Sequence, residues 1–307
     1  MDVGYKHPES IKDVQSALEG QGYFPSEGLA SAVFLAISLQ RPIFLEGAPG
    51  VGKTEVAKVI SSWLQSELIR LQCYEGLDAS HAIYEWNYSK QLLHLRTSEA
   101  SGRAKGIDEK DLEDELYNER FLVRRPLLKA IDYVGEIPPV LLIDELDRAD
   151  DEFEAFLLEL LSDYSVTIPE LGEFSSSVPP IVVITSNRTR DVHDALKRRC
   201  LYHWVDHPGY EREIQILKAK APDVSEKLIR RIAAAVEQIR EMNLYKPPGI
   251  SESIDWAMAL ERIGNSDLTE DGVKATIGAL LKYREDQQKV TEHGVGRIVK
   301  DAYARAV

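Results

Sequence analysis

The stretch that decides the fold of this chain reads Gly47-Ala48-Pro49-Gly50-Val51-Gly52-Lys53-Thr54. It fits the pattern G-x-x-x-x-G-K-T, which is typical of loops that bind phosphate groups. A short apolar run over residues 42–46 precedes it and predicts a buried strand. After it, apolar residues recur at the spacing of one helix face, at Val56, Val59, Ile60, Trp63 and Leu64. We therefore predict a strand, a phosphate loop and a helix in this order.

The residue types of the loop suit a nucleoside triphosphate. Its glycines allow a sharp turn that directs backbone N–H groups at phosphate oxygens, and the N-terminus of the following helix favours the same anion. Lys53 would place its charge beside the β- and γ-phosphates, and the Thr54 hydroxyl would ligate Mg²⁺. A chance glycine-rich turn is the alternative, and the flanking strand and helix argue against it. We expect ATP to bind to Gly47, Ala48, Pro49, Gly50, Val51, Gly52, Lys53 and Thr54.

The composition of the whole chain limits the classes of function. The 307 residues allow one large or two ordinary domains, and the hydrophobic share of 44% is normal for a globular protein. No apolar run is long enough for an integral membrane segment, and residues 1–10 do not resemble a signal peptide, so we expect a cytoplasmic location. A net charge of −14 disfavours nucleic acid as a partner, because its phosphates attract lysine and arginine.

Two carboxylates end a second predicted buried strand. Residues 140–143 are apolar, and Asp144 and Glu145 follow them directly. The carboxyl ends of strands are the places where open α/β sheets bind their ligands. Asp144 would hold Mg²⁺, and Glu145 would act as the general base on the attacking water. A pair of helix-capping residues is the alternative interpretation.

Polar residues beside two further predicted strands complete the candidate site. Asn187 follows a buried strand at residues 181–184 and would orient the attacking water by hydrogen bonding. Arg198 and Arg199 precede a strand at residues 201–205. An arginine supplied by a neighbouring subunit would stabilise the charge that develops in the transition state.

The pattern of elements predicts two domains. Up to residue 208 strands alternate with helices, which indicates an α/β nucleotide-binding domain over residues 1–208. Residues 209–307 show helical patterns only, so we expect an α-helical lid domain there. Within these domains we predict single helices over residues 121–133 and 286–305. The acidic run of residues 108–119 is interpreted as a solvated helix face, and a contact surface for a partner or a neighbouring subunit is the alternative.

These motifs resemble those of the AAA+ ATPases. The matching stretches are residues 47–54 as Walker A, 140–145 as Walker B, 185–187 as sensor 1, and 195–199 around the arginines. Longer stretches resemble the MoxR branch of that family, and within it the CoxD-like proteins. These are residues 71–78, 84–88, 158–163 and 186–190.

The resemblance implies a fold, an assembly and partners. The fold would be an AAA+ P-loop core, with a parallel sheet between helices, followed by a helical lid. Residues 74–139 would contain the helix-2 insert, and residues 164–180 the pre-sensor-1 hairpin. Subunits would form a ring, a hexamer in this branch, with Arg199 or else Arg198 acting on the neighbour's ATP. The implied partners are a von Willebrand A domain protein and a metalloenzyme client, above all a molybdenum hydroxylase such as carbon monoxide dehydrogenase.

The chain departs from the family pattern in the lid. Many relatives carry an arginine that contacts the γ-phosphate within a Gly-x-Ser-Pro-Arg pattern, and the matching stretch here is Gly249-Ile250-Ser251-Glu252-Ser253. Ser253 therefore stands where that arginine would be. Either another residue such as Arg262 replaces it, or lid closure depends less strictly on the nucleotide.

Three kinds of function fit these features. The leading interpretation is an ATP-hydrolysing chaperone or remodeller that matures a metalloenzyme. A nucleotide-dependent switch is the second, and other clients of the branch, such as carboxylase activation or metal chelation, stay open with it. A DNA motor of the replicative-helicase type is the third, and it would require a basic pore, which the acidic balance disfavours.

Overall fold

The protein is described from a computed structural model that covers residues 7–100 and 114–306. The chain divides into two compact units. The first comprises the residues up to Ser10, Ser31–Leu45 and Ile60–His203, and the second comprises Ile11–Ala30, Glu46–Val59 and Trp204–Val307. The division of the chain into domains at residues 208 and 209 stays a prediction.

A five-stranded sheet forms the centre of the first unit. Its strands are β1 (Ile43–Glu46), β2 (Leu68–Gln72), β5 (Val140–Asp144), β8 (Ile181–Ser186) and β9 (Leu201–Trp204), in the order β2-β5-β8-β1-β9. β5 pairs in parallel with β2 and with β8. Every residue of β1, β5 and β8 is buried, as parallel strands covered on both faces require. The predicted α/β fold class is confirmed.

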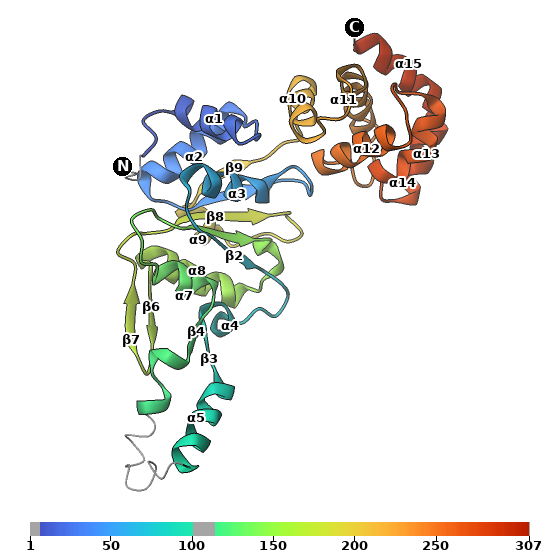
Figure 1. Ribbon diagram of the computed structural model, residues 1–307. Helices are drawn as coiled ribbons and strands as arrows, with labels where there is room; N and C mark the ends of the chain where they lie inside the picture. Colours follow the sequence, from blue (N-terminus) through green and yellow to red (C-terminus); the bar gives the residue numbers. More distant parts are fainter. Residues whose placement is uncertain (1–6, 101–113, 307) are drawn as a thin grey trace. The chain divides into compact units, whose positions relative to one another are not determined.

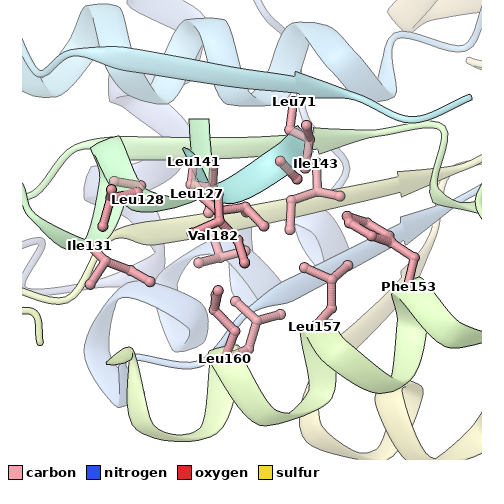
Figure 2. Packing of buried hydrophobic residues seen from close by; sticks show 14 of the residues in the cluster. Leu71, Leu127, Leu128, Ile131, Leu141, Ile143, Phe153, Leu157, Leu160 and Val182 are labelled. Atoms are coloured by element: carbon pink, nitrogen blue, oxygen red, sulfur yellow. The ribbon is translucent and has the colours of Figure 1, made fainter. Parts of the chain in front are cut away.

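One face of this sheet packs onto the main hydrophobic core. Ile69 and Leu71 of β2, Leu141 and Ile143 of β5, and Val182 and Ile184 of β8 share that face, because side chains alternate along a strand. They contact α7 (Pro126–Ile131) and α8 (Asp151–Asp163), as Figure 2 shows for Leu71, Leu141, Ile143 and Val182 against Leu127, Ile131, Leu157 and Leu160. The intervening residues Arg70, Gln72, Asp144 and Thr185 therefore lie on the opposite face.

The segment between β2 and β5 contains the predicted insert region. Its elements are α4 (Ala79–Ile83), β3 (Tyr84–Trp86), α5 (Tyr88–Ala100), η1 (Glu119–Phe121) and β4 (Leu122–Arg124), and β3 pairs antiparallel with β4 (Figure 1). The single helix predicted over residues 121–133 is wrong. Arg125 is extended and Pro126 opens α7, because a proline fits the first turn of a helix and disfavours helix before it. Part of the acidic run, residues 108–113, lies outside the described residues.

Three shorter elements of the first unit follow α8. β6 (Ser165–Ile168) and β7 (Gly172–Ser175) form an antiparallel hairpin within residues 164–180, and Gly172 at the start of β7 adopts φ +90°. α9 (Asp194–Arg199) lies between β8 and β9 and carries both candidate arginines in its last turn.

The second unit is helical. It contains α1 (Ile11–Gly20), the first residues of α2 (Glu27–Leu39) and of α3 (Lys53–Leu64), α10 (Tyr210–Lys220), α11 (Glu226–Arg240), α12 (Ile250–Arg262), α13 (Glu270–Leu280), α14 (Arg284–His293) and α15 (Val295–Arg305). The single helix predicted over residues 286–305 is wrong, because Gly294 adopts φ +101° and separates α14 from α15. No helix in the described ranges is both long and apolar enough to cross a bilayer.

Candidate nucleotide site

The phosphate loop follows β1 and lies in the second unit. Gly50 and Gly52 adopt φ of +79° and +93°, values that side-chain-bearing residues rarely adopt. A Cβ atom on Gly47 would lie 2.4 Å from the carbonyl oxygen of Val205, so the close approach of these two segments requires glycine there. The three glycines singled out in the sequence are therefore needed for the path of the backbone.

The Lys53 side chain folds back onto the start of the phosphate loop. Its Nζ donates hydrogen bonds of 2.8 Å to the carbonyl oxygens of Gly47 and Ala48, and only 6% of the residue is exposed. Lys53 also opens α3, so the ammonium group and the positive helix N-terminus lie in the same short segment as Thr54. Pro49 is exposed and Val51 is buried. This arrangement of N–H groups and one cation suits a bound phosphate chain.

A cavity of about 260 Å³ adjoins the loop within the second unit. Its walls are largely apolar and aromatic, with two cations and one carboxylate. They are formed by Gly22, Tyr23, Phe24, Val51, Gly52, Glu55, Arg212, Ile216, Lys220, Ile250, Ser251 and Ile254. An apolar cleft with a few polar groups beside a phosphate loop is the kind of site that holds the base and sugar of a nucleotide.

The start of α12 contacts the phosphate loop directly. The backbone N–H groups of Ile250 and Ser251 donate to the carbonyl oxygen of Gly50 at 2.9 and 3.4 Å. Ser253 is fully buried, and its hydroxyl donates to the carbonyl oxygen of Gly249 at 3.1 Å. Arg262 stands at the other end of α12, about 18 Å from Ile250 at 1.5 Å per residue. The suggestion that Arg262 replaces the lid arginine is therefore wrong for this structure.

Asp144 ends β5 on the face of the sheet opposite the core, in the first unit. Its carboxylate is 2% exposed and accepts hydrogen bonds from the Thr185 hydroxyl at 2.6 Å and from the Arg70 guanidinium at 2.5 Å. Its backbone oxygen accepts from the N–H of Cys73 at 2.9 Å. The buried carboxylate is thus stabilised by one neutral and one charged donor.

Glu145 occupies a strained backbone conformation directly after β5. Its φ of 55° and ψ of 51° are left-handed, which costs about 1–3 kcal/mol for a residue with a side chain and is typical of functional sites. The Thr185 hydroxyl accepts its N–H at 2.9 Å. Its carboxylate accepts from Asn187 Nδ2 at 3.2 Å and from Gln72 Nε2 at 3.1 Å, and Arg148 approaches to 3.5 Å. The structure therefore brings Glu145 and Asn187 together, the two residues predicted to act on water.

Asp147 supports this arrangement and was not predicted from the sequence. It accepts hydrogen bonds from the backbone N–H groups of Asn187 and Thr189 at 3.1 and 2.8 Å and from the Thr189 hydroxyl at 2.7 Å. Burial alone would raise the pKa of Asp147, but these donors together lower it below the ordinary value. Asp147 is therefore an anionic anchor that fixes the segment carrying Asn187.

Arg70 and Gln72 were also missed by the sequence analysis. The signal lies in β2, where they alternate with the buried residues Ile69 and Leu71. Alternation of this kind puts two polar side chains on one face of a strand. Because β2 pairs with β5, that face is the one on which Asp144 lies.

The two candidate arginines lie on α9 and have partners elsewhere in the first unit. The Arg198 side chain is 80% exposed and pairs with Asp194 at 2.7 Å. Arg199 donates through Nη1 to the carbonyl oxygen of Leu158 at 3.1 Å. No bond from either arginine to Glu145 is among the contacts of the described residues.

The sheet and the phosphate loop together define a P-loop nucleotide-binding protein. The family described as AAA domain (dynein-related subfamily) matches residues 42–200, just over half of the chain. The chain belongs to this AAA family, so the predicted AAA+ fold is confirmed.

The chain is also similar to individual proteins and solved structures. Uncharacterized proteins from Staphylococcus epidermidis and Staphylococcus aureus are 28% and 27% identical over 273 residues, which is 85% of this chain and 91% of each relative. The RuvB Holliday junction branch migration motor of Thermotoga maritima aligns with a TM-score of 0.46 at 16% identity, over 88% of this chain and 72% of that one. Domain III of the replication initiation protein DnaA from the same organism aligns with a TM-score of 0.47 at 14% identity, over 85% and 95%.

Proposed function

We propose that this AAA protein binds ATP at the phosphate loop and hydrolyses it, with Glu145 as the general base. The observation that carries the proposal is the way Glu145 is held. Two neutral amides, from Asn187 and Gln72, donate to its carboxylate and orient it toward the place of an attacking water, from which it would accept a proton. A carboxylate neutralised by a buried cation would be a poorer base.

The phosphates and Mg²⁺ would be held by the residues that the sequence singled out. Lys53 and the loop N–H groups would contact the phosphates, and the cavity beside Tyr23 would take the base and sugar. The Thr54 hydroxyl and the Asp144 carboxylate are hard oxygen donors of the kind that Mg²⁺ prefers, and they fit it as ligands. When bound, Mg²⁺ would neutralise charge on the β- and γ-phosphates.

The test of this proposal compares two variants. Glu145→Gln should bind ATP with nearly native affinity and turn it over at least about 100-fold more slowly, the usual contribution of a general base. Lys53→Ala should lose nucleotide binding, which fluorescence titration with a labelled ATP analogue would measure. Native turnover in Glu145→Gln would exclude the proposed base, and native affinity in Lys53→Ala would exclude the loop as the phosphate site. A native protein that binds ATP but never turns it over would favour a nucleotide switch.

We also propose that the subunits form a ring in which an arginine of α9 completes the neighbour's site. Arg199 is the first candidate and Arg198 the second, because both stand at the exposed C-terminal end of a short helix. Membership of the AAA family supports a ring, and a hexamer is the state that the sequence resemblance implies. An arginine acting across such an interface contributes about 10³-fold or more to turnover.

The client proposal rests on the resemblance to MoxR and CoxD-like sequences. The protein would act as a chaperone with a von Willebrand A domain protein in the maturation of a molybdenum hydroxylase. Affinity capture with Glu145→Gln, ATP and Mg²⁺ in the native host tests it, because slow turnover would keep clients bound. A von Willebrand A protein together with a molybdenum hydroxylase in the eluate would support the proposal. A different metalloenzyme, or the protein alone, would overturn the choice of client and leave the ATPase proposal intact.

A further inference from the structure

Arg41 contacts the end of α9 that carries both candidate arginines. It lies in the connection between α2, which ends at Leu39, and β1, which begins at Ile43. Its Nε donates to the carbonyl oxygen of Arg199 at 3.1 Å, and its Nη2 donates to that of Arg198 at 3.0 Å. One guanidinium thus holds two successive backbone carbonyl groups, and all three residues belong to the first unit.

The length of α9 makes this contact important. The helix has six residues, so most of its carbonyl groups have no partner within the helix, and a helix this short is unstable without outside contacts. A guanidinium presents its donors in a rigid planar fork, which fixes direction better than an ammonium group does. Arg41 therefore sets the path of the backbone from which the Arg198 and Arg199 side chains extend.

Further contacts join the chain around β1 to the end of α9 and to β9, which follows α9. The Leu201 N–H donates to the carbonyl oxygen of Pro42 at 2.8 Å. The Lys197 ammonium lies 5.6 Å from the centre of the Phe44 ring, and Phe44 stacks with Tyr202 at 6.2 Å between ring centres. The segment from Arg41 to Phe44 and the segment from Lys197 to Tyr202 are thus linked at several points, and Arg41 contributes two hydrogen bonds from one guanidinium.

We infer that Arg41 is a positioning residue for the arginine that acts on the neighbouring subunit. By holding the Arg198 and Arg199 carbonyl groups, it directs one of these side chains out of the subunit and joins it mechanically to β1 of the same subunit. This inference rests on the proposed function, because it presupposes an arginine that acts across a subunit interface. Loss of Arg41 in one subunit should therefore slow ATP hydrolysis in the neighbouring subunit and leave the nucleotide site of its own subunit intact.

The first measurement is steady-state turnover of the assembled protein with Arg41→Met. Because loss of the fork lets α9 shift, we expect kcat to fall about 10- to 100-fold, the effect of a displacement of about 1 Å at a catalytic group. KM for ATP and the nucleotide affinity of the dilute protein should stay native. The kcat of Arg41→Lys should lie between those of Arg41→Met and the native protein, because lysine keeps the positive charge but lacks the planar fork of donors. Arg297→Met, an exposed arginine on α15, is the matched control and should match the native protein.

Mixing of subunits separates an effect on the neighbour from an effect within the subunit. Glu145→Gln subunits cannot hydrolyse their own ATP but offer intact arginines. Mixed with Arg41→Met subunits, they should restore turnover at the Arg41→Met sites above the sum of the two variants alone. Absence of such a gain would overturn the inference, because it would mean that Arg41 acts on the phosphate loop of its own subunit. If Arg41→Met does not fold, Arg41→Lys enters the same mixture.

A reference mixture distinguishes this inference from the proposed function. Arg199→Ala or Arg198→Ala, whichever alone abolishes turnover, is mixed with Glu145→Gln in the same way. If that mixture regains activity and the Arg41 mixture does not, only the role of Arg41 is wrong. If neither arginine variant is rescued, the arginine acting across the interface is wrong, and the inference on Arg41 falls with it.

Discussion

Two buried or half-buried glutamates, Glu145 at the end of β5 and Glu213 on α10, are held in opposite ways. Glu145 is about one-third exposed, and its carboxylate accepts from two neutral amides at 3.1 and 3.2 Å. Glu213 is fully buried, and its carboxylate accepts two hydrogen bonds from Arg240. Nη2 donates to Oε1 at 3.0 Å, and Nη1 donates to Oε2 at shorter range. The first carboxylate can exchange partners with water, whereas the second cannot.

The difference shows what each unit requires of a carboxylate. Arg240 also donates to the carbonyl oxygen of Pro248 at 2.8 Å, so the Glu213 pair fixes the chain just before α12. Burial raises the pKa of Glu213, and Arg240 opposes this shift only in part. A buried ion pair of this kind fixes structure, and the loosely held Glu145 is suited to chemistry.

The largest expected effect comes from breaking the buried pair. Arg240→Met leaves Glu213 buried without its cation, which should lower the free energy of unfolding by about 3–5 kcal/mol. Chemical denaturation followed by circular dichroism would measure the loss. The double variant Arg240→Met, Glu213→Leu should recover most of it, because a well-packed apolar pair replaces the ion pair. A single variant as stable as the native protein would contradict the structural role given to this pair.

The second prediction concerns the loosely held carboxylate. Asn187→Ala removes one of the two amides that orient Glu145, so kcat should fall about 100-fold, the effect of losing one preorganised donor. The free energy of unfolding should stay native, because Glu145 remains in contact with water. Steady-state turnover and denaturation of the same preparation would check both. Loss of stability with unchanged turnover would mean that the contact between Asn187 and Glu145 serves the fold, as the Glu213 pair does, and not the chemistry.

Much of the fold and of the site was predictable because local patterns carry it. β1, β5 and β8 are short apolar strands, and each is followed at once by residues of the candidate site, so both signals lie within a few residues of sequence. The place of Arg70 and Gln72 in the site could not be predicted, because nothing in the sequence of β2 shows that β5 is its neighbour in the sheet. The contact of Arg41 with α9 could not be predicted for a similar reason, since its partners lie more than 150 residues away in the sequence.

Both wrong helix predictions have local causes. Pro126 begins α7 and does not lie within a longer helix, and Gly294 divides the region of residues 286–305 into two helices. The tight fit of Gly47 against Val205 depends on a strand far along the chain, so sequence alone could assign that glycine only to a turn.

The third prediction uses His207, which lies near both Lys53 and Arg240 in the second unit. Burial, and then the charge of Arg240, lower the pKa of His207 to about 4, and its Nδ1 has no hydrogen-bond partner in the described part of the chain. The unfolded chain takes up a proton near pH 6.5, so the folded state binds fewer protons between pH 6.5 and 4. Stability is therefore lost as the pH falls through this window, by about 2 kcal/mol.

Denaturation curves at several pH values test this, with His207→Gln as the comparison. The variant should lose less stability than the native protein between pH 6.5 and 4, because it has no group to protonate there. Parallel pH profiles for the two proteins would show that His207 is not the responsible group.

The smallest expected effect is that of Arg262→Ala. α12 meets the phosphate loop through Ile250 and Ser251, and Arg262 stands at its far end with an exposed side chain. A side chain about 18 Å along the helix from the loop cannot reach a phosphate there, so ATP affinity and kcat should each change less than about twofold. A tenfold loss of affinity would mean that α12 docks on the loop in another way once ATP is bound.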